Sequence, residues 1–539
     1  MSKILKTVKA VAAVAAAGAA GVAIKAKTED KTVKRIVVEE AGDSLISSLI
    51  NAVGKALPMP EFEKLEDYEG KNFYAGHGTF IEKAKRGAKW KFGYARESLT
   101  PDDYLTNRYY IAGYLHFPPN AMTGVLDDIA VRAICMDDSS GRGAVAFAVI
   151  DCVGLSGTDV REIRKRLEDF AKEKGIASIN VSAVHCHSGI DTQGLWGDLP
   201  AIVKNNVKAI KKNKPEDLIS GKNKQFMQRL FELSAKAITD AYNGMTAGKL
   251  SFAMTDKLNH NRDKRPPDVI DKNLLTLHFE PSDGSRQTVA AFFAAHPVSV
   301  GYNNTECSGD FIYYMEEEVN KADKNFIYFQ GAELAVATNG DFIPEDIPDD
   351  RSFIRYGRAM GRYVANIPDE EKTKLTPIIN IRHSEAFVPC KSPILRLAGQ
   401  AGIINNKVLR SGKKSTDLCI ATEIGFVEMG NELAFALVPG EIAAEIQLGG
   451  APDEVTSYNR RPWNYPTLNS MTERHLTVIG LCNDAIGYIL PDNDFGSMLA
   501  KLHYEESVST GNRAGSCITS AFKRLTEECD RLRAVKSKK

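Results

Sequence analysis

A pair of histidines in the stretch INVSAVHCHSG, residues 179–189, is the first feature of this chain that could do chemistry. The apolar run at 179–184 predicts a strand that delivers His185 and His187 at its carboxyl end. Residues i and i+2 of an extended chain project to one side, so we expect the two imidazoles to face together and Cys186 to face away. The pair indicates a metal site, although His-x-His also occurs by chance.

Three more strand-like runs end in a residue of a type that binds metal. These residues are His296 after the run 288–295, Glu441 after 433–438, and Tyr488 after 476–481. Because strand ends can meet at one edge of a sheet, we expect these side chains to converge with His185. Zinc accepts imidazole nitrogen and carboxylate oxygen, and a catalytic site leaves one position for water. His296 can equally be a polar residue held at a turn by Pro297, and Glu441 a carboxylate in the first turn of a helix.

The elements that must position these residues indicate an α/β fold. Residues 129–135 and 144–151 predict a hairpin, a helix follows from about residue 158, and Gly175 ends it before the strand at 179. Such a β-α-β unit implies two parallel strands joined by a right-handed crossover. We therefore expect a mixed, partly parallel β-sheet core flanked by helices, with the metal site at the carboxyl ends of strands.

The bulk composition is that of an ordinary globular protein and limits the partners. The 539 residues are 43% hydrophobic, and 69 Lys and Arg balance 69 Asp and Glu. No overall field therefore favours nucleic acid, and none is expected as a partner. The nine cysteines form no CxxC pair and no repeated spacing, which argues against a disulfide scaffold.

The ends of the chain differ from its middle. Lysines in the first ten residues precede a fifteen-residue uncharged run, so residues 1–24 resemble a signal peptide or an N-terminal anchor. We interpret 25–70 as a linker, 71–515 as the catalytic domain and 516–539 as a basic helical tail. This predicts a secreted or membrane-anchored protein with membrane association through the N-terminus; a cytoplasmic protein with an Ala-rich tail is the alternative.

Eight short segments, in order between residues 126 and 509, resemble the catalytic domain of the neutral ceramidases. They are SAVHCHSG (182–189), NHNR (259–262), AAHPVSVGYNN (294–304), SGDF (308–311), NGDF (339–342), LVPGE (437–441), GLCNDAIGYI (480–489) and YEES (504–507). The resemblance implies that His185, His296, Glu441 and Tyr488 hold one zinc ion. It further implies that His187 handles protons or stabilises the tetrahedral intermediate, and that Arg262 binds the polar head of the substrate or the developing oxyanion.

The resemblance implies a zinc-dependent hydrolase in which a zinc-bound hydroxide attacks an N-acyl amide bond, such as that of ceramide or another lipid amide. Three departures bear on the substrate. Ile343 stands where the family has a serine implicated in activity, residues 190–193 replace a Gly-rich run, and the C-terminal β-sandwich has no room. A zinc hydrolase for a different ester or amide, and a catalytically silent binding or cell-envelope protein, therefore stay open as alternatives.

Overall fold

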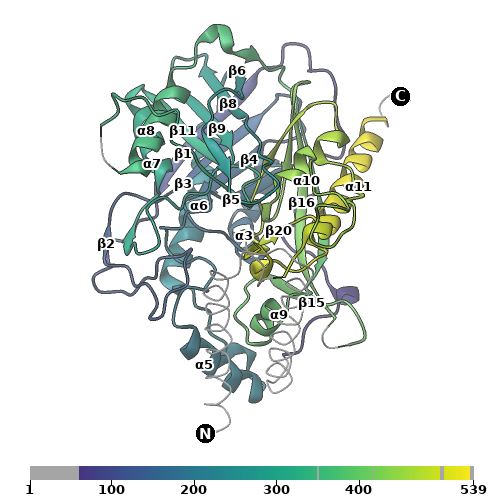
Figure 1. Ribbon diagram of the computed structural model, residues 1–539. Coiled ribbons are helices and arrows are strands. Elements are labelled where there is room, and N and C mark those ends of the chain that lie inside the picture. Colours follow the sequence, from purple (N-terminus) through teal and green to yellow (C-terminus); the bar gives the residue numbers. More distant parts are fainter. Residues whose placement is uncertain (1–59, 349–350, 415–416, 498–502, 535–539) are drawn as a thin grey trace.

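Two β-sheets pack face to face in the computed structural model, which describes residues 60–348, 351–414, 417–497 and 503–534 (Figure 1). The larger sheet has the order β11 (Lys324–Gln330), β9 (Gln287–Phe293), β8 (Leu274–Pro281), β6 (Thr246–Thr255), β1 (Trp90–Ser98), β3 (Ala130–Asp137), β4 (Val145–Ile150) and β5 (Ser178–Ala183), with β13 (Thr373–Lys374) beside β6. The smaller sheet has the order β14 (Ile379–Pro389), β16 (Leu418–Met429), β17 (Leu433–Leu437) and β19 (His475–Ile479), with β15 (Lys407–Arg410) beside β16.

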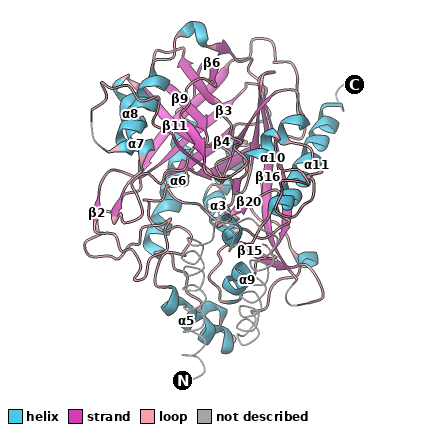
Figure 2. Cartoon of the chain, in the orientation of Figure 1, coloured by secondary structure: helices cyan, strands magenta, loops and turns pink. Residues whose placement is uncertain are grey.

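Three short pairs complete the strands, and helices cover the outer faces of both sheets (Figure 2). The pairs are β2 (Gly124–Val125) with β10 (Glu306–Cys307), β7 (Asn261–Asp263) with β12 (Val336–Thr338), and β18 (Glu441–Ile442) with β20 (Tyr488–Ile489). The α-helices are α3 (Gly157–Arg166), α4 (Glu168–Lys174), α5 (Leu199–Lys211), α6 (Lys224–Asn243), α7 (Phe311–Lys321), α8 (Ser352–Ala365), α9 (Pro393–Gln400), α10 (Ala444–Leu448) and α11 (Ala514–Ala534).

The apolar faces of the strands explain the layering. Phe292 of the larger sheet lies 5.1 Å, ring to ring, from Phe435 of the smaller one, within one buried core between the sheets. A second core lies between the larger sheet and helices that include α3 and α6, and a third between the smaller sheet and α11. All twelve residues of β16 are buried, because its sheet is covered on both faces.

The predicted α/β fold with a mixed sheet is confirmed. Strands β4 and β5 are parallel, as are β9 and β11, whereas β3 and β4 form the predicted antiparallel hairpin. Between β4 and β5, Ser156 caps α3 through a capping box with Asp159, and Gly175, at a φ of 66°, ends α4. These local signals set where the β-α-β unit stops, and so where His185 begins its loop.

The predicted segments at the two ends of the chain are tested little. Residues 1–24 and most of 25–70 lie outside the described residues, so the signal or anchor stays a prediction. The predicted basic tail contains most of α11, whose Ile518, Phe522 and Leu525 are buried against the smaller sheet. Within the described part of the chain, no helix is both long enough and apolar enough to span a membrane.

Candidate metal centre

The predicted metal ligands meet where strand ends of the two sheets come together, not at one edge of a single sheet as we expected. His185 follows β5 and His296 follows β9, both in the larger sheet. Glu441 and Tyr488 follow β17 and β19 of the smaller sheet, and they lie opposite each other in the parallel pair of β18 and β20. One sheet therefore supplies the imidazoles and the other supplies the oxygens.

Three side-chain atoms converge at this junction. The Nε2 atoms of His185 and His296 lie 3.1 Å and 3.3 Å from the same oxygen of Glu441, Oε2. All three residues are at least 95% buried. The Nε2 atom of His187 lies 3.0 Å from that of His185. The nitrogens of the three histidines fall within 4.8 Å of one another, which is compatible with a shared metal ion.

The backbone fixes the tautomers of His185 and His296. Their Nδ1 atoms lie 2.7 Å from the carbonyl oxygen of Val153 and 3.2 Å from that of Val336, so each Nδ1 carries the hydrogen. Each Nε2 then presents a lone pair toward Glu441. Because Glu441 Oε2 is buried and receives no hydrogen bond from the described residues, lone pairs face one another there. A cation between these atoms would remove that conflict, so the donor set fits a divalent metal.

His187 lies beside these residues, and its ring packs against those of His185 and Tyr114. Its ring centre is 4.7 Å from that of His185 and 5.1 Å from that of Tyr114. Gly113, at a φ of 102°, leaves room for the imidazole, because a Cβ there would lie 2.5 Å from the ring. Burial lowers the pKa of His187, and the neighbouring histidines lower it further, so the ring is neutral near pH 7.

We predicted that His185 and His187 share one side because both lie in an extended strand, and that reason was wrong. Strand β5 ends at Ala183, and His185 has a φ of 68°, so the pair follows the strand instead of lying in it. Cys186 does face the other way, as predicted, since its Sγ lies 3.1 Å from the carbonyl oxygen of Ser308. The left-handed turn brings the two imidazoles together.

Two buried amides, outside the predicted site, position the strand ends. The Nε2 of Gln330, at the end of β11, donates to the carbonyl oxygens of Val184 (3.0 Å) and Ala295 (2.8 Å), each directly before a histidine. Asn483 accepts a hydrogen bond from Val181 N through its Oδ1 (2.9 Å). Gln330 therefore joins three strands of the larger sheet, and Asn483 docks the end of the smaller sheet onto β5.

Arg262 and Tyr488 are placed differently. Tyr488 is buried, and burial together with the charge of Glu441 raises the pKa of its phenol. Arg262 lies on β7 opposite Ala337, which forms a bridge with His296, but the Arg262 residue is exposed. The structure thus brings the backbone of Arg262 near the centre. The roles of both residues stay predictions.

Sequence reasoning missed Glu333. It is 0% exposed, and a carboxylate oxygen lies within 4.8 Å of the ligand atoms of His185 and Glu441. Burial raises the pKa of Glu333, and the charge of Glu441 raises it further. The sequence feature that could have identified Glu333 is that it is the single acidic residue in the otherwise apolar run 332–337. Ile343, in the place we aligned with the family serine, packs against the core between the sheets.

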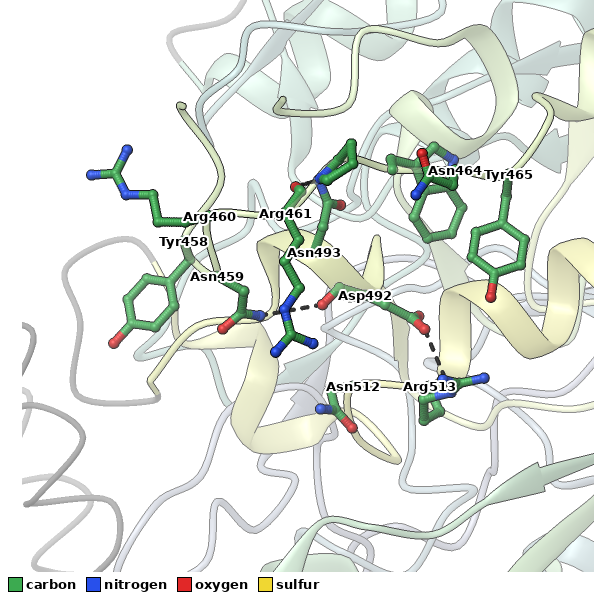
Figure 3. Close-up of a pocket in the computed structure, with 12 residues that line it drawn as sticks. Tyr458, Asn459, Arg460, Arg461, Asn464, Tyr465, Asp492, Asn493, Asn512 and Arg513 are labelled. Atoms are coloured by element: carbon green, nitrogen blue, oxygen red, sulfur yellow. Dashed lines mark hydrogen bonds and ion pairs between the residues drawn. The ribbon is translucent and has the colours of Figure 1, made fainter. Parts of the chain in front are cut away.

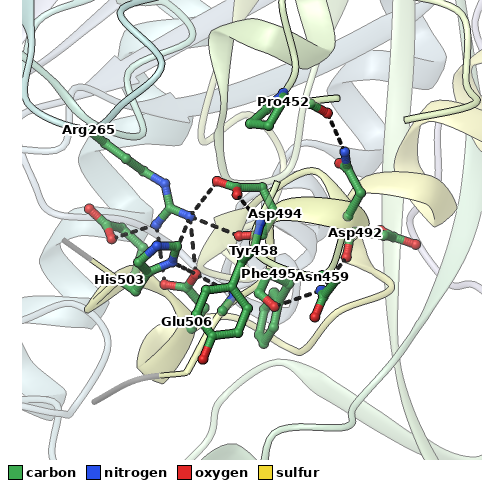
Figure 4. A network of polar contacts seen from close by, with 12 residues as sticks. Arg265, Pro452, Tyr458, Asn459, Asp492, Asp494, Phe495, His503 and Glu506 are labelled. Atoms are coloured by element: carbon green, nitrogen blue, oxygen red, sulfur yellow. Dashed lines mark hydrogen bonds and ion pairs between the residues drawn. The ribbon is translucent and has the colours of Figure 1, made fainter. Parts of the chain in front are cut away.

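An ionic cluster anchors the segment beyond Tyr488 (Figure 4). The buried guanidinium of Arg265 contacts the carboxylates of Asp494 (3.2 Å), Glu505 (3.0 Å) and Glu506 (3.1 Å). These contacts hold the short η7 helix (Glu505–Val508) in place. The ring centre of Tyr504, the residue directly before η7, therefore stays 6.0 Å from the ring centre of Tyr488.

A separate cavity of about 850 Å³ adjoins this cluster, since the backbone N of Tyr458, in its lining, donates to Asp494 (Figure 3). Its lining combines arginines, asparagines and aromatic rings, namely Tyr458, Asn459, Arg460, Arg461, Pro462, Trp463, Asn464, Tyr465, Asp492, Asn493, Asn512 and Arg513. None of these residues belongs to the metal centre. The cavity is therefore distinct from the site at the strand ends.

Comparison with solved structures finds the same fold in ceramidases. The neutral ceramidase from Pseudomonas aeruginosa matches with a TM-score of 0.59 at 14% identity, over 83% of this chain and 75% of that one. A structure described as ceramidase complexed with C2 matches with a TM-score of 0.60 at 14% identity, over 83% and 76% of the two chains. No protein-family model and no curated protein sequence matches the chain. This chain has a ceramidase-like fold.

Proposed function

We propose that the chain is a zinc-dependent hydrolase of the ceramidase type that cleaves an N-acyl amide bond. The observation that carries the proposal is the convergence of His185 Nε2 and His296 Nε2 on one oxygen of Glu441. Donor atoms about 2.0–2.1 Å from a tetrahedral zinc ion are separated by about 3.3 Å. The 3.1 Å and 3.3 Å distances between these atoms agree with that spacing.

A bound zinc ion would act as a Lewis acid and would lower the pKa of a water molecule to about 7. His185, His296 and Glu441 would hold it, with the Tyr488 phenol beside Glu441 as the fourth ligand. The carbonyl groups of Val153 and Val336 keep both ligand imidazoles in the tautomer that presents Nε2.

His187 is suited to moving a proton to the leaving amine. Its ring is neutral, and its Nδ1 is buried without a hydrogen-bond partner among the described residues. A neutral imidazole has one N–H and one lone pair, so it can accept a proton and pass it on. Arg262 would bind the polar head of the substrate, for which its exposed position on β7 is suitable.

The amide bond is the part of the proposal that rests on resemblance. The two solved structures compared with this chain above are both ceramidases, which favours an amide of a lipid. Ile343 has no hydroxyl with which to assist an acyl transfer, so we infer that water is the nucleophile. An ester or a small polar amide is the alternative substrate class, and turnover assays separate the two.

Metal analysis and turnover test the proposal in that order. We expect about one zinc per chain in the purified protein, and His185→Ala or Glu441→Ala should lose it. His475→Ala, at the opposite end of β19, is the matched control and should keep its zinc. A wild-type protein that takes up no zinc contradicts the proposal.

If zinc is bound, release of sphingosine from a short-chain fluorescent ceramide tests the lipid amide directly. Turnover of simple N-acyl amides without turnover of ceramide would move the substrate to small amides. Turnover of esters alone would refute the amide assignment.

A further inference from the structure

Glu333 is a fully buried carboxyl group for which the expected ligand set has no role. Both of its carboxylate oxygens are buried and have no hydrogen-bond partner among the described residues. One of them lies within 4.8 Å of the ligand atoms of His185 and Glu441, so the carboxyl group points at the metal centre. Burying a carboxyl group without any partner is costly, and native structures rarely retain one without a reason.

Among the described residues, no group forms a hydrogen bond with the Glu333 carboxyl group. On the metal side lie Glu441, which carries the same sign, and His185, whose Nδ1 hydrogen is already donated to Val153. On another side lies Gly480, where a Cβ would approach Glu333 Oε2 to 3.2 Å. The flanking Ala332 and Leu334 are buried in the apolar core beneath α11. A glycine and apolar neighbours make room for the carboxyl group but cannot pair with it.

The backbone holds Glu333 firmly in this position. Its carbonyl oxygen accepts a hydrogen bond from Val336 N (2.8 Å), which closes a turn over residues 333–336. The same Val336 accepts hydrogen bonds from the backbone N and the Nδ1 of His296. One short turn therefore orients both a predicted ligand and the additional carboxyl group.

We propose that Glu333 is a further ligand of the ion held by His185, His296 and Glu441. Two carboxylates would balance the two charges of a divalent ion, while the imidazoles stay neutral. One ion is favoured over two because His185 belongs to both possible ligand groups and its Nδ1 is committed to Val153. The proposal rests on the proposed function in that it needs the same ion.

Two substitutions separate a ligand from a buried spacer. Glu333→Gln keeps the shape of the side chain and removes its charge, so we expect zinc affinity, measured by competition with a chromogenic chelator, to fall at least tenfold. Glu333→Leu removes an unpaired polar group from an apolar hollow. We expect it to weaken zinc binding while raising the melting temperature of the metal-free protein. A residue with a merely structural role would not move the two readouts in opposite directions.

Cobalt substitution reports directly on the ligands, because the visible absorption of Co²⁺ depends on its coordination. We expect the Co²⁺ spectrum of Glu333→Gln to differ from that of the wild type in position or intensity. Equal zinc affinity within twofold and identical cobalt spectra would overturn the proposal.

Glu441→Gln distinguishes this failure from a failure of the proposed function. If Glu441→Gln loses zinc and Glu333→Gln does not, only the role of Glu333 is refuted. A wild-type protein that binds neither zinc nor cobalt refutes both.

Discussion

Replacing Gln330 by methionine should destabilise the protein more than any other single amide substitution at the strand ends. Its side chain accepts from Ala295 N (3.0 Å) and donates to the carbonyl oxygens of Ala295 (2.8 Å) and Val184 (3.0 Å). Gln330→Met keeps the volume and leaves these three buried backbone groups without that partner. The substitution leaves the Tyr328 hydroxyl with an acceptor, because this hydroxyl also lies 2.9 Å from the Phe293 carbonyl oxygen.

The expected loss follows from the cost of each unpaired group. At about 1–3 kcal/mol for each buried donor or acceptor, three groups amount to roughly 3–9 kcal/mol. That is a large share of a total stability of about 5–15 kcal/mol. Zinc affinity should fall as well, since Val184 and Ala295 directly precede the two proposed ligand histidines.

Urea unfolding of the metal-free variant, followed by circular dichroism, measures this loss. The matched control is Gln225→Met, at an exposed position of α6, which should change stability by less than about 0.5 kcal/mol. A destabilisation of Gln330→Met below about 1 kcal/mol would refute the assignment of Gln330 as the joint between the strands.

Three further predictions concern buried groups. Arg132→Met should destabilise the fold by about 3–5 kcal/mol in urea unfolding, because the buried carboxylate of Asp151 loses its cation and that of Glu316 keeps only Arg96; a loss under 1 kcal/mol would contradict this. Burial lowers the pKa of His383 to about 4. Between about pH 6.5 and pH 4 this histidine is protonated in the unfolded state but not in the folded state, so the free energy of unfolding decreases as the pH falls through this range. The wild type should lose about 1–2 kcal/mol more than His383→Gln between pH 6.5 and pH 5, and parallel pH profiles would refute this. Gly113→Ala should displace the His187 ring and lower kcat at least tenfold with zinc content unchanged, and unchanged kcat would exclude a role for that ring position.

Local patterns in the sequence predicted the elements that carry the imidazoles. The apolar run before His185, the helix ended by Gly175 and the hairpin before it all depend on neighbouring residues, so spacing alone reveals them. The fact that a ligand-type residue follows each of four strands was likewise visible, and the structure brings His185, His296 and Glu441 into contact.

The pairing between distant strands could not be predicted in the same way. Strands β5 and β9 are far apart in the order of their sheet, yet Gln330 joins the residues that follow both. No periodicity in the sequence indicates this contact between distant strands, because the contact depends on how the sheet curls. The division of the strands into two sheets is hidden for the same reason, since strands of both sheets are buried along their whole length, as β4 and β16 are.

The composition of the centre bears on how a ceramidase-like fold would work in this chain. Ile343 stands in the position we aligned with the family serine and packs against the core, whereas Glu333 brings a second buried carboxyl group to the candidate metal centre. A catalyst without that hydroxyl depends more strongly on the ion to activate water, and a second carboxylate would hold the ion more tightly but make it less electrophilic. The two differences therefore act in opposite directions on water activation. Under the proposals made here, Glu333→Gln would lose zinc affinity while each zinc-loaded molecule would retain or gain turnover.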